Sequence, residues 1–319
     1  MPRTHVISPD LVHYLWDAGN APAVHIESGD TVAVETRDVA DNQVVSGSTT
    51  ADLANIDFAR LYPLAGPVHV AGAEPGDTLA VEILSLETRG WGWTALLPGL
   101  GLLSDDFPDP YLRLFDLDTA QRDADGGQVT YLRDDIAIPV EPFLGTMGVC
   151  PAGAAAQGVM PPGGFGGNID IRQLVAGATL YLPVQEPGAL FSCGDAHAAQ
   201  GDGEVCVTGI ESPMGGELRF TLHKGRRIAA PQYSLPAGSL TRRVDRGGWY
   251  GTTGVGGDLY RAAQDAVRAM IDHLGTTRGL SREEAYLLCS LVVDLKISEV
   301  VDAGEFIVSA LLPDAVFVG

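Results

Sequence analysis

Short runs of alternating apolar and polar residues recur along the chain, separated by glycine and proline. Alternation with a period of two is typical of β-strands that bury one face. The 40 glycines and 20 prolines are spread along the chain, which fits many strands joined by tight turns. The predicted strands cover residues 31–36, 68–71, 78–84, 179–184, 205–210, 218–223 and 306–312.

A helical period appears only near the C-terminal end. Apolar residues between Leu259 and Leu274 recur at the spacing of one helix face, and Gly275 predicts the end of that helix. A second helix is predicted to begin at Ser281, because Ser281 and Glu284 have the spacing of a capping box. Asp294 and Lys296, which follow this helix, are interpreted as a surface pair.

These patterns predict a mainly β fold, with two packed sheets of sandwich or jelly-roll type and a C-terminal helical pair. We expect a single domain over residues 1–319, since no clean linker divides the chain. The Pro- and Gly-rich stretch 151–167 is the place for an internal division if there is one. We interpret that stretch as a loop of the functional site instead.

The composition is that of a folded, acidic protein. Lysine and arginine number 20 against 41 acidic residues, a formal charge of −21, so the surface repels nucleic acid phosphates and anionic membranes. We therefore expect neither as a main partner. The four cysteines have no CxxC spacing and are interpreted as reduced, mostly buried thiols. The first ten residues lack an apolar signal core, so a cytoplasmic location is expected.

Two glycine-flanked polar segments, residues 166–172 and 194–204, carry the candidate chemistry. Polar groups are costly to bury unless a metal ion or a polar substrate satisfies them, so both segments predict a functional site. Asp195 and His197 are two residues apart, which places both side chains on one face of an extended segment. Imidazole and carboxylate together are suitable ligands for Zn²⁺.

Asn168 and Asp170 show the same spacing of two residues. We predict that they complete the metal site, with an Asx-type turn as the alternative for this pair. Glu204 is interpreted as a general base or a further ligand. Glu211 stays open between a buried partner and a position at the edge of a loop.

The segment 142–151 is apolar and interrupted by glycine. We predict that it lines a small pocket and offers backbone N–H groups to an oxyanion, with a kinked, buried strand pair as the alternative. Cys150 as a nucleophile needs a partnered base and a lowered pKa, which no sequence pattern indicates. The predicted substrate contacts are Gly145, Met147, Gly148, Cys150 and Gln200.

Several ordered blocks resemble the acetamidase/formamidase family, which hydrolyses short-chain amides to a carboxylate and ammonia. The most specific block is GDAHAAQGDGE at 194–204. The other blocks are 66–77, 92–94, 98–103, 142–151, 166–172, 180–184, 188–191, 285–288 and 294–295. The resemblance implies a β-rich sandwich with helical additions, a homo-oligomer, and a centre formed by Asp170, Asp195, His197 and Glu204.

Two functions are considered. The first is hydrolysis of formamide- or acetamide-type amides by water that a divalent metal, most suitably Zn²⁺, activates, with Glu204 and His197 as catalytic residues. The chain has only two lysines, Lys224 and Lys296, and no motif surrounds them, which argues against amidases that use a catalytic lysine. The second is a non-catalytic β-sandwich that binds a metal or a small molecule through the same carboxylates.

Overall fold

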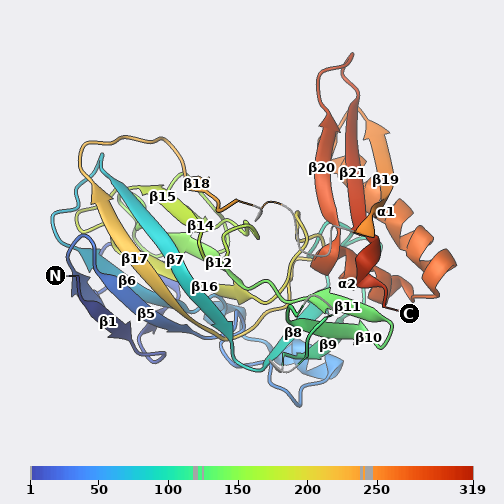
Figure 1. Cartoon of the computed structure of the whole chain (residues 1–319), viewed down its shortest axis with the longest axis horizontal. Coiled ribbons are helices and arrows are strands. Elements are labelled where there is room, and N and C mark those ends of the chain that lie inside the picture. The colour runs from blue at the N-terminus through green and yellow to red at the C-terminus, as the bar shows by residue number, and fades with distance from the viewer. Residues whose placement is uncertain (1, 118–120, 124–125, 238–239, 241–246, 319) are drawn as a thin grey trace.

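The computed structural model describes residues 2–117, 121–123, 126–237, 240 and 247–318. Two β-sheets pack face to face, and a lobe that contains both helices lies beside them (Figure 1). The predicted two-sheet sandwich with a C-terminal helical pair is confirmed. Among the described residues, no helix has the length and apolarity needed to cross a membrane.

The first sheet contains, in spatial order, β1 (Thr4–Ile7), β5 (Thr31–Thr36), β17 (Met214–His223), β7 (Thr78–Thr88), β15 (Thr179–Pro183) and β18 (Gln232–Ser234). The second contains β14 (Gly166–Asn168), β12 (Phe143–Gly148), β16 (Phe191–His197), β6 (Leu64–Val70) and β2 (Val12–His13), with β4 (Val24–Ile26) also paired to β6. Three two-stranded sheets are β3 (Leu15–Trp16) with β13 (Gln157–Gly158), β8 (Trp91–Leu96) with β9 (Tyr111–Asp116), and β10 (Val129–Arg133) with β11 (Ile136–Pro139). The 3-10 turns are η1 (Thr50–Asn55), η2 (Phe58–Arg60) and η4 (Asp314–Val316).

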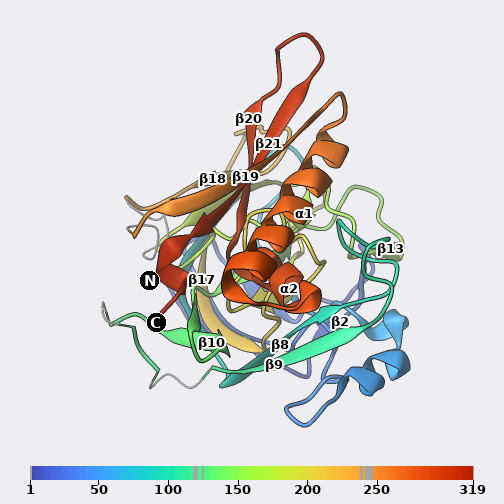
Figure 2. The ribbon, with the colours of Figure 1, turned by 90° about the vertical axis from the view of Figure 1, so that its right-hand side faces the viewer.

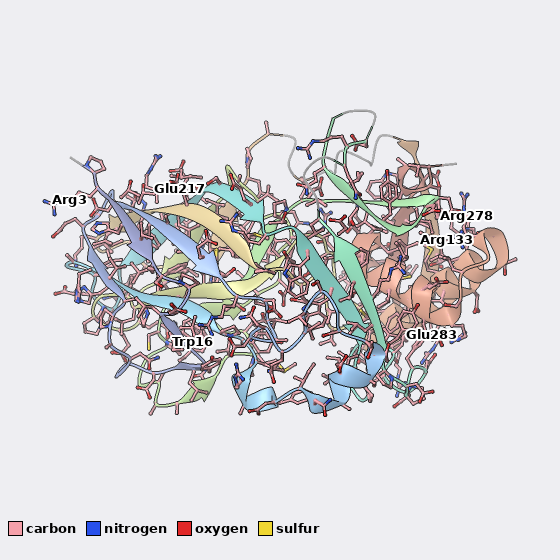
Figure 3. All side chains as sticks on the ribbon, turned by 90° about the horizontal axis from the view of Figure 1, so that it is seen from below. Arg3, Trp16, Arg133, Glu217, Arg278 and Glu283 are labelled. Atoms are coloured by element: carbon pink, nitrogen blue, oxygen red, sulfur yellow. The ribbon has the colours of Figure 1, made fainter. Side chains whose placement is uncertain are left out.

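Alternation along the strands builds the core between the two sheets. In β5, Val32 and Val34 are buried while their sequence neighbours are only half-buried. They join one hydrophobic cluster with residues from both sheets, including Leu218 of the first sheet and Phe191 of the second. Burying such side chains stabilises the sandwich by roughly 1.5–3 kcal/mol each. Figure 3 shows the same arrangement from below, with Trp16 among the sandwich strands.

The C-terminal lobe has its own core. Its sheet, β19 (Trp249–Gly256), β21 (Phe306–Pro313) and β20 (Asp294–Glu299), is covered by α1 (Leu259–Arg278) and α2 (Arg282–Val292) (Figure 2). The apolar stripe of α1, including Ala266 and Met270, packs with Leu288 of α2 and Leu312 of β21. This is the helical periodicity that the sequence shows.

The helix ends agree with the sequence at one boundary and differ at another. Ser281 Oγ accepts from the Glu284 backbone N–H at 3.2 Å, and Glu284 Oε2 accepts from the Ser281 N–H at 3.1 Å, so the capping box is confirmed. The helix α1 does not end at Gly275. It continues to Arg278, because the left-handed conformation that terminates it occurs at Gly279, where φ is 63°.

Two further expectations are corrected. Residues 205–210 form a buried loop rather than a strand, because left-handed backbone at Glu204 (φ 41°) and Val207 (φ 74°) bends the chain. Asp294 is not part of a surface pair, since it is 2% exposed and accepts two hydrogen bonds from Arg172, at 2.8 and 3.1 Å. Lys296 is exposed and lies over the ring of Trp249.

The ion pair of Arg172 and Asp294 joins three segments of the chain: the loop after β14, the turn after β16 and the start of β20. Arg172 follows β14, and Asp294 opens β20. The Asp202 backbone N–H also donates to Asp294 Oδ1 at 2.9 Å, while Asp202 Oδ1 lies 3.2 Å from Arg172 Nε. The turn after β16 is therefore fixed to both the sandwich and the helical lobe.

We predict that Asp294→Ala lowers the free energy of unfolding by about 3 kcal/mol, because, among the described residues, it leaves Asp202 as the one ion-pair partner of the buried Arg172 guanidinium. Urea unfolding followed by circular dichroism measures the change. The control is Asp105→Ala at an exposed position, expected within about 0.5 kcal/mol of the parent chain. Equal effects of the two substitutions would show that the buried pair does not hold the lobes together.

Candidate functional site

Five acidic or imidazole side chains meet where β16 ends. Asp195 and His197 belong to β16, and Asp170 lies two residues beyond β14. Glu204 and Glu211 come from the loop that joins β16 to β17. We call this group the acidic cluster.

The imidazole of His197 lies at the centre of the acidic cluster. His197 Nε2 is 3.4 Å from Asp195 Oδ1, 3.1 Å from Glu211 Oε2 and 3.9 Å from Glu204 Oε1. Possible ligand atoms of Asp170, Asp195 and His197 lie within 4.8 Å of one another, and so do those of His197, Glu204 and Glu211. The two polar segments of the sequence thus converge in space.

The backbone is strained where three of the carboxylates attach. Asp170, Asp195 and Glu204 have φ values of 45°, 52° and 41°, in the left-handed region that non-glycine residues rarely adopt. Each such residue costs roughly 1–3 kcal/mol and persists only where its surroundings hold it. With this backbone conformation the three carboxylates lie next to His197. Bringing these like charges together therefore lowers the stability of the fold.

Gly145 makes room for this arrangement. In the β12–β16 ladder, residues on either side of Gly145 and Asp195 are paired, but these two are not. The Gly145 carbonyl accepts instead from the N–H groups of Ile169 and Asp170, at 3.0 and 3.1 Å. A Cβ at Gly145 would collide with Asp170 Oδ1 and come within 2.8 Å of the Asp195 carbonyl oxygen, so only glycine fits.

Gln200 sets the tautomer of His197. Its Nε2 donates to the Asp170 carbonyl oxygen at 3.0 Å, which leaves Oε1 as an acceptor, 2.7 Å from His197 Nδ1. His197 therefore carries its proton on Nδ1 when neutral, and the lone pair of Nε2 is directed at the carboxylates. This is how a second partner commonly orients a metal-binding histidine.

Glu211 is a member of the cluster that the sequence left undecided. It is 2% exposed, and its Oε1 accepts from the Gly209 N–H at 3.0 Å. Its backbone exchanges two hydrogen bonds with Trp93, at 2.7 and 2.9 Å. No motif surrounds Glu211 in the sequence. The bend of the preceding loop brings Glu211 to the cluster, and that bend depends on tertiary contacts that a sequence pattern does not show.

Burial and like charges raise the pKa values of the cluster. Burial, followed by the charge of Asp195, raises the pKa of Asp170 to about 7, and burial raises that of Glu211 to about 7. Burial and the charge of Asp170 hold the pKa of Glu204 well above its ordinary range. Burial alone lowers the pKa of His197, but the charges of Glu211 and Asp195 outweigh it and raise that pKa well above 6.5.

The donor atoms of the cluster fit a divalent cation. Among the described residues, seven buried side-chain atoms lack a hydrogen-bond partner, and three of them are Asp170 Oδ1, His197 Nε2 and Glu211 Oε2. Buried polar atoms without partners are costly, so their gathering in one place indicates a missing partner. Carboxylate oxygens and a neutral imidazole nitrogen are ligands that Zn²⁺ and similar ions accept.

A cavity of about 390 Å³ adjoins the acidic cluster. Asp195, Glu204 and Glu211 line one part of it, together with Asn168. Thr146 Oγ1 donates to Asn168 Oδ1 at 2.8 Å, which positions that side chain. Most of the remaining lining residues are apolar or aromatic: Tyr14, Leu15, Val39, Ile56, Phe58, Ala59, Leu61, Tyr62, Trp93, Leu97, Leu100, Val159, Met160, Pro161 and Val207.

The five expected substrate contacts lie outside the lining of this cavity, although Gly145 and Gln200 contact the acidic cluster itself. Met147 is fully buried in the sandwich core, and Cys150 is 2% exposed with a thiol pKa that burial raises to about 11. Neither they nor Gly145, Gly148 and Gln200 are among the residues that line the cavity. Gly145, Met147 and Gly148 belong to β12, which is paired on both edges, by β14 and β16. The assignment of these five residues as substrate contacts stays a prediction.

The chain matches the model of the Acetamidase/Formamidase family over residues 6–158 and 152–318. It therefore belongs to the acetamidase/formamidase family. It is 28% identical over 269 residues to the acetamidase of Mycolicibacterium smegmatis, covering 67% of this chain and 66% of that protein. It is 28% identical over 246 residues to the formamidase of Methylophilus methylotrophus, covering 62% and 60%. The chain thus spans less than two thirds of the length of these relatives.

Solved structures share the fold. A gamma lactamase from Delftia acidovorans matches 99% of this chain and 93% of its own with a TM-score of 0.89, and at 24% identity this likeness shows the fold alone. An acetamidase from Bacillus halodurans, 31% identical, matches 96% of both chains with a TM-score of 0.67.

We predict that the stability of the metal-free protein falls between pH 5.5 and pH 8. The carboxyls of Asp170 and Glu211 have folded pKa values of about 7, above the ordinary values near 4. Their protons stabilise the folded chain fully below about pH 4, and this contribution is lost as the pH rises through about 7. Differential scanning fluorimetry should show a lower Tm at pH 8, by at least about 2 °C.

Added Zn²⁺ should raise the Tm by more at pH 8 than at pH 5.5, because at the lower pH protons compete with the cation for the same carboxylates. Asp170→Asn is the control, and its Tm should depend less on pH. A Tm of the metal-free chain that rises between pH 5.5 and pH 8 would contradict the electrostatics of the cluster.

Proposed function

We propose that this chain hydrolyses short-chain aliphatic amides of the formamide and acetamide type to a carboxylate and ammonia, with water activated by a divalent metal. Zn²⁺ is the ion that we consider first. Relatives named acetamidase and formamidase support amide hydrolysis. The observation that carries the metal is the set of three unpartnered buried atoms in the acidic cluster.

The ligands that we assign are Asp170, Asp195 and His197, whose possible ligand atoms lie within 4.8 Å of one another. Asp170 Oδ1 lies 4.0 Å from His197 Nδ1, and Asp195 Oδ1 lies 3.4 Å from Nε2. When bound there, a divalent cation supplies Lewis acidity and lowers the pKa of a water molecule to about 7. Glu211 lies 3.1 Å from the same Nε2 and adds negative charge to the site. Asn168, expected as a ligand, is the neutral neighbour in this proposal, since its Oδ1 already accepts from Thr146.

Glu204 is the general base in this proposal. Its carboxylate lies 3.9 Å from His197 Nε2, and it also lines the cavity from which an amide approaches. It takes a proton from the attacking water and delivers it to the departing amide nitrogen, since an amine leaves only when protonated. His197 keeps its proton on Nδ1 through Gln200 and therefore holds its ligand position during this transfer.

Neither lysine provides a covalent alternative. Lys224 Nζ lies 2.7 Å from Asp77 Oδ2, and Lys296 lies over the ring of Trp249. Neither residue lines the cavity.

The expectations of a cytoplasmic location, a homo-oligomer, and no nucleic-acid or membrane partner stay predictions.

We predict that Glu204→Gln lowers kcat for ammonia release from acetamide by about 10²–10⁴-fold, because the amide side chain cannot accept the proton. The bound Zn²⁺, measured by elemental analysis, should stay the same, since the three assigned ligands are intact. The matched control is Glu217→Gln on the exposed face of β17 (Figure 3), which should keep the parent kcat. Loss of Zn²⁺ from Glu204→Gln would make Glu204 a ligand rather than the base.

Removal of the metal tests the function itself. Dialysis against a chelator should abolish ammonia release from formamide and acetamide, and added Zn²⁺ should restore it, but not in His197→Ala. Ammonia release from protein that elemental analysis finds metal-free would disprove the metal mechanism. Bound metal without ammonia release from any amide would favour the alternative, a non-catalytic metal-binding sandwich.

A further inference from the structure

The cavity beside the acidic cluster is larger than a formamide or acetamide molecule needs. An apolar cavity of about 150 Å³ accommodates benzene, which has six heavy atoms, so a four-atom amide needs roughly 100 Å³. The cavity here is about 390 Å³. A short amide placed at the carboxylates therefore leaves most of the apolar walls in contact with water.

The walls continue directly from the acidic cluster. Trp93 exchanges two backbone hydrogen bonds with Glu211, which sets the indole ring beside the carboxylates. Tyr62 lines the same cavity as Asp195 and Glu204, and burial, followed by the charge of Asp195, holds its pKa far above the ordinary value. An amide whose carbonyl lies at the carboxylates therefore has its acyl group against these two rings.

Hydrogen bonds and ion pairs fix the walls in place. Trp93 Nε1 donates to the buried Asp38 carboxylate at 3.2 Å. Tyr14 Oη donates to Asp41 Oδ2 at 2.9 Å, and Asp41 also holds Arg60 at the end of η2. A wall that is already in place costs little to order when an apolar ligand binds.

The mouth of the cavity is also apolar. Leu15, Phe58 and Met160 line it and are 42%, 62% and 44% exposed. Among the described lining residues, none is a lysine, an arginine or a histidine. An anionic substituent would therefore meet apolar walls and the acidic cluster, with no cationic side chain among the described lining residues to pair with it.

We infer that the preferred substrates are neutral primary amides with an apolar acyl group of about six to ten carbons, and that formamide and acetamide are poorer substrates. This inference rests on the amide hydrolysis proposed above and adds the substrate class. Each methylene that the walls bury only in the bound complex should raise kcat/KM about four-fold.

The test compares kcat/KM for formamide, acetamide, butyramide, hexanamide and adipamate, the last being hexanamide with a terminal carboxylate. The Zn²⁺-loaded protein should hydrolyse hexanamide on the order of 10²-fold more efficiently than acetamide. The kcat/KM for adipamate should be at least about ten-fold lower than that for hexanamide. Its terminal carboxylate would lose its hydration in the cavity without gaining a cationic partner. Ammonia release from acetamide with no increase along the series would overturn the substrate class while leaving amide hydrolysis intact.

A matched pair of variants locates the effect. Leu97→Asn keeps the size of a half-buried wall residue and removes its apolar character, so the hexanamide-to-acetamide ratio of kcat/KM should fall at least about three-fold. Leu11→Asn makes the same change at a residue that is 48% exposed and does not line the cavity, so it should leave the ratio unchanged. Equal ratios in both variants and the parent chain would overturn the role of these walls.

Calorimetric binding separates failure of the inference from failure of the proposed function. If no amide is hydrolysed but hexanamide binds at least about ten-fold more tightly than acetamide, the substrate class stands and the hydrolysis does not. If hexanamide binds no more tightly than acetamide, the inference is wrong whether or not ammonia is released.

Discussion

The mutual repulsion of four carboxylates around one buried imidazole governs this structure. Two unit charges 4.8 Å apart repel by about 3–4 kcal/mol at an effective dielectric constant of 20, and burial adds to that cost. Protons offset it in the metal-free chain, as the raised pKa values of Asp170 and Glu211 show. In the proposed metal site, a divalent cation would offset the repulsion without protonating the carboxylates, so the geometry that is costly alone would become a binding site.

The surrounding fold supplies the rigidity that this repulsion requires. The sandwich fixes Asp195 and His197 on β16, a strand paired on both sides, so neither side chain can withdraw with its backbone. The buried pair of Arg172 and Asp294 attaches the two loop segments of the cluster to the helical lobe. Left-handed backbone at three carboxylate positions is tolerable only within such a frame.

The sequence predicted what depends on local periodicity. Strand β5 occupies the predicted residues 31–36, and the capping box at Ser281 forms, because alternation and capping need only neighbouring residues. The run 205–210 alternates like a strand, but left-handed backbone at Glu204 and Val207 bends it into a loop. Glu211 and the wall residues Tyr62 and Trp93 come from distant segments, so no local pattern could assemble them with Asp195.

The acidic cluster and the apolar wall of the cavity come from different parts of this chain. The acidic cluster comes from β16, the loop that follows it and the loop that follows β14, whereas most of the apolar wall comes from residues 39–62, 93–100 and 158–161. Residues in the wall can therefore change size or polarity without moving the carboxylates, which the sandwich and the Arg172–Asp294 pair hold independently. A family name describes a common reaction on one fold, and we infer that the cavity wall selects the amide for which this chain is suited.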